Sequence, residues 1–104
     1  MLSESDFRLQ ADHAIERLDR TLATLGDSEG FEVELQNGVL QVVFEEPAPA
    51  KFVISPNAPV RQIWVSALSR SYKLSWASQS STFELDGESL ESLLTRLTRE
   101  YLAS

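Results

Sequence analysis

The sequence predicts an α+β fold, a two-layer α-β-α sandwich in which two helices pack on one face of an antiparallel sheet of five or six strands. Three observations predict it. Apolar residues repeat at helical spacing near the start of the chain and again near its end. Between them lie short runs rich in β-branched and aromatic residues, separated by turn residues. Two helices flanking a set of strands in this order can cover one face of a single sheet, and the other face is then open to solvent.

The first helix is predicted from one apolar stripe whose members recur every three or four positions, as one face of a helix does. They are Phe7, Ala11, Ala14, Leu18, Leu22 and Leu25. Ser3 followed by Asp6 resembles a capping box and predicts where the helix begins. Gly26 stands where a C-cap glycine would end it.

Asn37-Gly38 predicts a two-residue hairpin turn, because both central residues of a type I′ turn need a positive φ. Such a turn fixes the register of the strands on either side of it. The predicted pairs are Gln36 with Val39, Leu35 with Leu40, Val33 with Val42, and Phe31 with Phe44. Three apolar pairs then share one face, and Glu32 and Glu34 fall on the other.

Further strands are expected at residues 51–55, 61–67, 72–76 and 82–85. Asp86-Gly87 is expected to cap a second helix with an apolar stripe of its own. That stripe consists of Leu90, Leu93, Leu94, Leu97 and Tyr101. The 104 residues are expected to form a single domain, residues 1–104.

Trp64 is expected on the open face of the sheet, because alternation in its strand sends Ile63 and Val65 toward the core. A tryptophan exposed among polar neighbours is typical of an interface anchor. The alternative is that Trp64 packs beneath neighbours such as Lys73 or Arg61.

Charge is unevenly distributed along the chain, whose net charge is −7 at pH 7. The first fifty positions hold eleven acidic and three basic residues, a net −8, and the remainder holds five acidic and six basic residues, a net +1. An acidic surface attracts cations and basic partners. It disfavours nucleic acid, because phosphate binding needs clustered lysine and arginine. A face that only keeps the protein soluble is the alternative.

The chain has no cysteine and one histidine, His13. These counts exclude a disulfide framework, a thiol nucleophile and a multi-histidine zinc site. Any metal must be held by oxygen ligands, which suit hard ions or weakly held iron. No stretch approaches the roughly 18 apolar residues of a membrane span, and the N-terminus lacks signal-peptide character. We therefore expect a cytoplasmic protein without membrane contact. No catalytic motif is present, so the pattern favours a binding module over an enzyme.

Four stretches together resemble the frataxin family, in its bacterial form. They are Asn37-Gly38-Val39-Leu40, Pro59-x-x-Gln62-Ile63-Trp64-x-Ser66, the segment 72–76, and Asp86-Gly87-x-Ser89-Leu90. The resemblance covers nearly the whole chain, and Pro-x-x-Gln-Ile-Trp is its most specific part. It implies the same α-β-α sandwich that the residue pattern predicts.

The resemblance implies weak binding of ferrous and ferric iron on an acidic ridge along the first helix and first strand. By position, the residues that match the ridge are Asp12, Asp19, Glu32 and Glu34. It also implies a role in iron–sulfur cluster assembly, as a monomer that contacts a cysteine desulfurase and a scaffold protein. The residues that match the partner-binding surface are Asn57, Gln62, Trp64 and Ser66. Trp76 matches the second tryptophan of the family.

The chain departs from the family pattern at the ridge. Residues 22–26 hold no aspartate where bacterial relatives carry a run of them, and Arg8 and Arg20 stand where they carry a histidine and a glutamate. Ser81 stands in place of a third tryptophan. Two alternatives therefore stay open: ferroxidase or iron-storage activity on the same carboxylates, and an acidic interaction module without a metal function.

Overall fold

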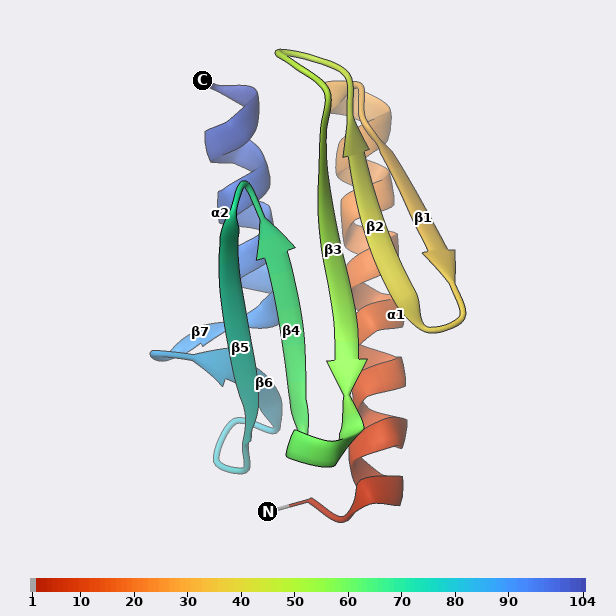
Figure 1. The fold of residues 1–104 in the computed structure, drawn as a ribbon, viewed down its shortest axis with the longest axis vertical. Helices are drawn as coiled ribbons and strands as arrows, with labels where there is room; N and C mark the ends of the chain where they lie inside the picture. The colour runs from red at the N-terminus through yellow and green to blue at the C-terminus, as the bar shows by residue number, and fades with distance from the viewer. Residues whose placement is uncertain (1) are drawn as a thin grey trace.

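Two helices cover one face of a single antiparallel sheet in the computed structural model, which describes residues 2–104 (Figure 1). The elements are α1 (Glu4–Glu29), β1 (Glu32–Gln36), β2 (Val39–Phe44), β3 (Ala50–Asn57), the 3-10 turn η1 (Ala58–Val60), β4 (Gln62–Ala67), β5 (Arg70–Ala77), β6 (Thr82–Leu85), β7 (Glu88–Ser89) and α2 (Leu90–Leu102). The strands pair in chain order, β1 to β7. The predicted fold is confirmed, with seven strands instead of five or six because the two-residue β7 extends the sheet.

The predicted register of the first hairpin is confirmed, since Gln36, Leu35 and Val33 pair with the expected residues of β2. Phe31 precedes β1, and its ring packs against that of Phe44 with centroids 5.2 Å apart. Burial falls along this face toward the turn, where Leu35 is 37 % exposed. The edge strand β1 is therefore best covered at the end where it leaves α1.

Helix α1 begins as predicted, because the Ser3 hydroxyl accepts a hydrogen bond from the Asp6 N–H at 3.1 Å. Its buried stripe differs slightly from the predicted one: Ile15 is fully buried, whereas Ala14 and Leu25 are half-buried. The buried members are Phe7, Ala11, Ile15, Leu18, Leu22 and Gly26.

The predicted end of α1 at Gly26 is wrong, because the helix continues to Glu29 and is capped by Gly30 in the left-handed conformation, φ 88°. Gly26 is buried within the helix, where an added Cβ would lie 2.5 Å from the backbone oxygen of Phe31. The chain needs glycine at this position for the close return of β1 against the helix, not for a cap.

The predicted cap of α2 at Asp86-Gly87 is also wrong, because these residues form the two-residue turn between β6 and β7, with φ values of 51° and 83°. Ser89 is the actual N-cap, and its hydroxyl accepts a hydrogen bond from the Ser92 N–H at 3.2 Å. The apolar stripe of α2 is as predicted, with Tyr101 half-buried at its end.

Aromatic rings fill the core at one end of the sandwich. Phe44 packs against both Phe52 and Tyr101, each with centroids 4.9 Å apart. The Tyr101 hydroxyl also donates to the Ala48 carbonyl in the loop between β2 and β3. These contacts fix α2 against the sheet and leave the opposite face of the sheet uncovered.

Candidate functional site

The uncovered face of the sheet carries Trp64, as the alternation of β4 predicts. Ile63 and Val65 are buried beneath the helices, while Trp64 is 37 % exposed on the outer side. Asn57 and Gln62 are paired across β3 and β4 on this outer side. Together with Ser66, all four residues predicted to bind a partner therefore share one face.

Trp64 is held in place by two neighbours. Its indole N–H donates a hydrogen bond to the side-chain oxygen of Gln62 at 2.9 Å. Lys73, its partner across β4 and β5, places its ammonium 4.8 Å from the ring centroid, within reach of a cation–π interaction. Arg61 points elsewhere and donates to the Ala58 carbonyl at 2.6 Å. Trp64 is therefore exposed and at the same time partly covered by Lys73.

A hollow of about 360 Å³ opens beside Trp64 on this face. It is lined by Val53, Ser55, Trp64, Val65, Ser66, Ser71, Tyr72 and Lys73. Sequence reasoning found Trp64 and Ser66 and named Lys73 as a possible neighbour of Trp64, but missed the other residues from β3 and β5. Finding them requires the register of β4 against β5, which is set by the turn at Leu68 and Ser69. Leucine is not a typical turn residue, so this pair gives a weaker signal than Asn37-Gly38 does.

The four residues predicted to bind iron lie on two sides of the edge strand β1. Asp12 is exposed and Asp19 half-buried, both on α1. Glu32 and Glu34 are exposed and point to the outer face of the sheet, opposite the core-facing residues of β1. The carboxylates therefore follow one edge of the molecule without converging on a point.

The side of α1 that carries Asp12 adjoins the first hairpin. A hollow of about 230 Å³ is lined by Asp12, Ile15 and Glu16 from α1 and by Leu35 and Gly38 from the hairpin. In residues 2–104, no group of three or more His, Asp or Glu side chains lies close enough to hold one metal ion. An ion bound here would keep most of its water shell, because each site offers it few protein oxygens.

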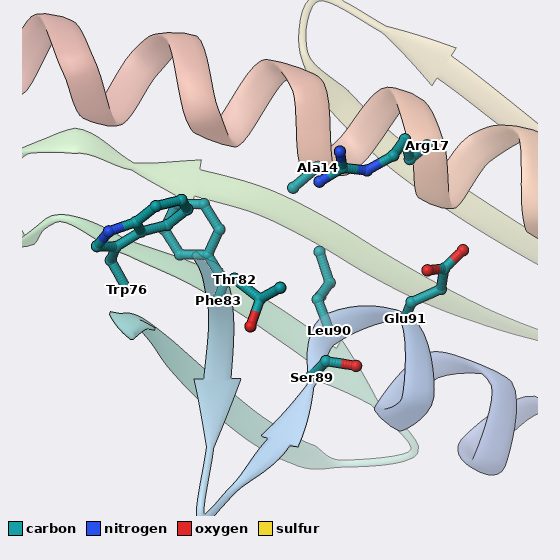
Figure 2. Close-up of a pocket in the computed structure, with 8 residues that line it drawn as sticks. All are labelled: Ala14, Arg17, Trp76, Thr82, Phe83, Ser89, Leu90 and Glu91. Atoms are coloured by element: carbon teal, nitrogen blue, oxygen red, sulfur yellow. The ribbon is translucent and has the colours of Figure 1, made fainter. Parts of the chain in front are cut away.

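A third hollow, of about 70 Å³, lies between the two helices and the sheet (Figure 2). Its lining comes from α1 (Ala14, Arg17), the strands (Trp76, Thr82, Phe83, Ser89) and the start of α2 (Leu90, Glu91). Figure 2 shows Trp76 beside Phe83 and the Leu90 side chain pointing into the space. The two rings meet edge to face, with centroids 5.1 Å apart. This volume is far below the roughly 300 Å³ at which ligand pockets begin, so it is too small for a cofactor. Sequence reasoning did not find it, because three distant segments form it.

The structure is thus an α+β sandwich with one uncovered sheet face, a tryptophan held on that face and carboxylates along one edge. A family model described as a frataxin-like domain matches residues 1–104. The chain therefore belongs to the frataxin family, which confirms the resemblance predicted from its motifs.

In residues 2–104, no helix is long and apolar enough to cross a membrane.

Relatives of known name agree with this assignment. The chain is 32 % identical to "Frataxin, mitochondrial" of Caenorhabditis elegans, over 99 % of this chain and 79 % of that protein. It is 31 % identical to "Iron-sulfur cluster assembly protein CyaY" of Pseudomonas fluorescens, over 84 % of this chain and 81 % of that protein. The protein of the same name from Pseudomonas aeruginosa is 32 % identical, over 83 % of this chain and 82 % of that protein. The names of the bacterial relatives link this family to iron–sulfur cluster assembly.

Proposed function

We propose that this chain is a cytoplasmic, monomeric regulator of iron–sulfur cluster assembly. It carries ferrous or ferric iron on the acidic ridge and docks on a cysteine desulfurase and its scaffold protein. The observation that carries the proposal is the match of the frataxin-like family model to residues 1–104, together with relatives named for cluster assembly. The physical features of the two surfaces support it.

Docking is assigned to the uncovered sheet face, with Trp64 as the anchor. Its hydrogen bond to Gln62 and its contact with Lys73 restrict the ring before a partner arrives. A restricted side chain loses less conformational freedom on binding, so more of its contact energy contributes to affinity. Asn57 and Ser66 add polar groups at either end of the same face.

Iron is assigned to the ridge residues Asp12, Asp19, Glu32 and Glu34 as a weakly held cargo. Carboxylate oxygens suit ferrous and ferric iron, and they also suit calcium and manganese. Because the four side chains lie on two sides of β1, we expect low affinity and little selectivity among these ions.

An amide NMR titration with ferrous iron in the absence of oxygen tests the iron assignment. Shifts should follow the edge formed by α1 and β1, and calcium should reproduce them at higher concentration. Changing Asp12 and Asp19 to Asn and Glu32 and Glu34 to Gln should abolish them. A matched control that changes Asp86 to Asn and Glu100 to Gln should retain them.

Shifts concentrated at residues 84–91 would contradict the ridge assignment. Oxygen consumption per iron added, measured on the same samples, separates a regulator from a ferroxidase. The proposed regulator consumes no more oxygen than iron alone in the same buffer, and a catalysed rise would favour the ferroxidase alternative.

A further inference from the structure

Strand β1 is an end strand of the sheet, and β2 is its only neighbouring strand in residues 2–104. Figure 1 shows no other described element beside its outer edge. Its five residues are exposed, except Val33, which is half-buried. The opposite end of the sheet differs, because β7 has only two residues and leads directly into α2. The described sheet therefore has one edge that is long enough to pair with a further strand.

The register of the first hairpin identifies the backbone groups that point outward from this edge. In a two-residue hairpin, the residues that flank the turn exchange both of their backbone hydrogen bonds, and such pairs then alternate along the strands. Gln36 and Val39 are the flanking pair here. The N–H and C=O groups of Val33 and Leu35 therefore point away from β2. In residues 2–104, no backbone hydrogen bond outside the regular elements reaches them.

The edge lacks the usual protection against pairing with other chains. Exposed edges are commonly protected by lysine, proline or a bulge. Strand β1 has the sequence Glu-Val-Glu-Leu-Gln and a regular register, so it has none of these. It carries Glu32 and Glu34 on its outer face instead. A second copy of β1 would bring glutamates of the two copies together, which is unfavourable. The charge thus disfavours a second copy and favours a strand of opposite charge.

The two faces of the edge define the side chains that an added strand needs. Successive side chains of a strand point to opposite faces. On the outer face they would lie beside the two glutamates, where lysine or arginine is favourable. On the other face they would lie beside Leu35, which is 37 % exposed and borders the hollow shared with Ile15, Asp12 and Glu16. An apolar side chain at that position would cover Leu35.

We propose that β1 accepts an extended protein segment, in which lysine or arginine alternates with apolar residues, as an added strand of the sheet. Backbone hydrogen bonds would supply affinity, and the alternating side chains would supply specificity. The inference goes beyond the proposed function, because neither iron binding nor docking through Trp64 requires strand pairing. The segment would compete with iron, since both lie against Glu32 and Glu34.

A synthetic Lys-Val-Lys-Val-Lys-Val-Lys peptide with blocked ends is the probe. Its matched control carries N-methyl groups on the valines, so it keeps the charge and loses the N–H groups that would bond to Val33 and Leu35. In amide NMR, the first peptide should shift the signals of these two amides and slow their hydrogen exchange. The methylated peptide should do neither. It should bind at least about tenfold more weakly, because two hydrogen bonds are lost.

Protein variants test the charge of the edge. Glu32→Lys combined with Glu34→Lys should abolish binding of the first peptide. Glu91→Lys combined with Glu100→Lys changes two exposed glutamates of α2 and alters the net charge equally. This control should bind the peptide nearly as tightly as the parent.

Four results would overturn the inference: no binding of the first peptide by the parent, equal affinity for both peptides, equal loss of binding in both variants, or shifts at Val33 that grow with the concentration of the protein alone. The second and third would show attraction by charge without strand pairing. The fourth would show a second copy at the edge. None of them changes the iron titration or the affinity for the desulfurase–scaffold complex, so the proposed function stands or fails separately.

Discussion

The indole N–H of Trp64 donates a hydrogen bond to the side-chain oxygen of Gln62, two residues earlier on the same face of β4. The bond satisfies the one polar group of the indole within the sheet surface and fixes the ring plane. The tryptophan is therefore presented in one orientation, which is what a docking anchor requires.

Gln62→Ala should weaken binding to the desulfurase–scaffold complex by about two- to tenfold, because a hydrogen bond of this kind contributes about 0.5–1.5 kcal/mol. The fold should be unaffected, since Gln62 is half-buried on the outer face and not part of the core. Calorimetric titration of the complex measures the effect. Unchanged affinity would mean that the orientation of the ring is not important for docking.

Thr98 is fully buried in α2, and its hydroxyl has no hydrogen-bond partner in residues 2–104. Thr98→Val keeps the shape and removes the unpaired group, so it should stabilise the fold by about 1 kcal/mol or more. The urea midpoint should rise with an unchanged slope. Thr95→Val, a half-buried control on the same helix, should have little effect. A lower midpoint for Thr98→Val would show that the hydroxyl is hydrogen-bonded in solution.

Arg96 donates two hydrogen bonds to Glu88, at 2.9 and 3.1 Å, and holds the pKa of Glu88 below its usual 4.5. Because the folded pKa lies below that of the unfolded chain, the pair stabilises the fold above about pH 4.5. That stabilisation is lost as the pH falls through the folded pKa. Glu88→Gln should therefore melt below the parent at about pH 6, and the difference should vanish as the pH falls below the folded pKa. A constant difference between the two proteins would contradict this linkage.

The acidic first half of the chain should reduce stability through like-charge repulsion. Added salt should raise the melting temperature by screening, and calcium or manganese should raise it further by binding the native state. The ridge variant carries Asp12→Asn, Asp19→Asn, Glu32→Gln and Glu34→Gln. Its melting temperature should be higher than that of the parent at low salt and should no longer rise when divalent ions are added. Differential scanning calorimetry compares the two proteins. An equal divalent response in both would place the ions elsewhere.

The sequence predicts this fold well where one local signal has one structural meaning. Asn37-Gly38 fixes the first hairpin because a type I′ turn allows a single register. Gly26 predicts a helix end that the structure does not have, because glycine serves both helix caps and close backbone approaches. Only the position of Phe31 distinguishes the two roles. Asp86-Gly87 suits a turn and a helix start equally well. It forms a turn because β6 pairs with β7 on either side of it.

The candidate site was predictable only in part, for a related reason. Alternation places Trp64 on the outer face, because a strand's period of two is a local property. The contact of Lys73 with Trp64 depends on how β5 pairs with β4. The sequence places a connection at residues 68–71, but it does not show that the turn consists of Leu68 and Ser69 alone, which sets this register. Whether the ridge carboxylates converge depends on how α1 packs against β1. The spacing of Asp12 and Asp19 along a helix therefore cannot predict it.

The central claim is that the uncovered sheet face docks on the desulfurase–scaffold complex through Trp64. The most direct test is the affinity of Trp64→Ala for that complex across a salt series, compared with the parent and with Glu32→Gln combined with Glu34→Gln. Loss of a tryptophan anchor costs about 2 kcal/mol or more, so Trp64→Ala should bind about thirtyfold more weakly at every salt concentration, with its fold intact. The double glutamate variant should be weakened mainly at low salt. Parent-like binding by Trp64→Ala, or unfolding of that variant, would contradict the account.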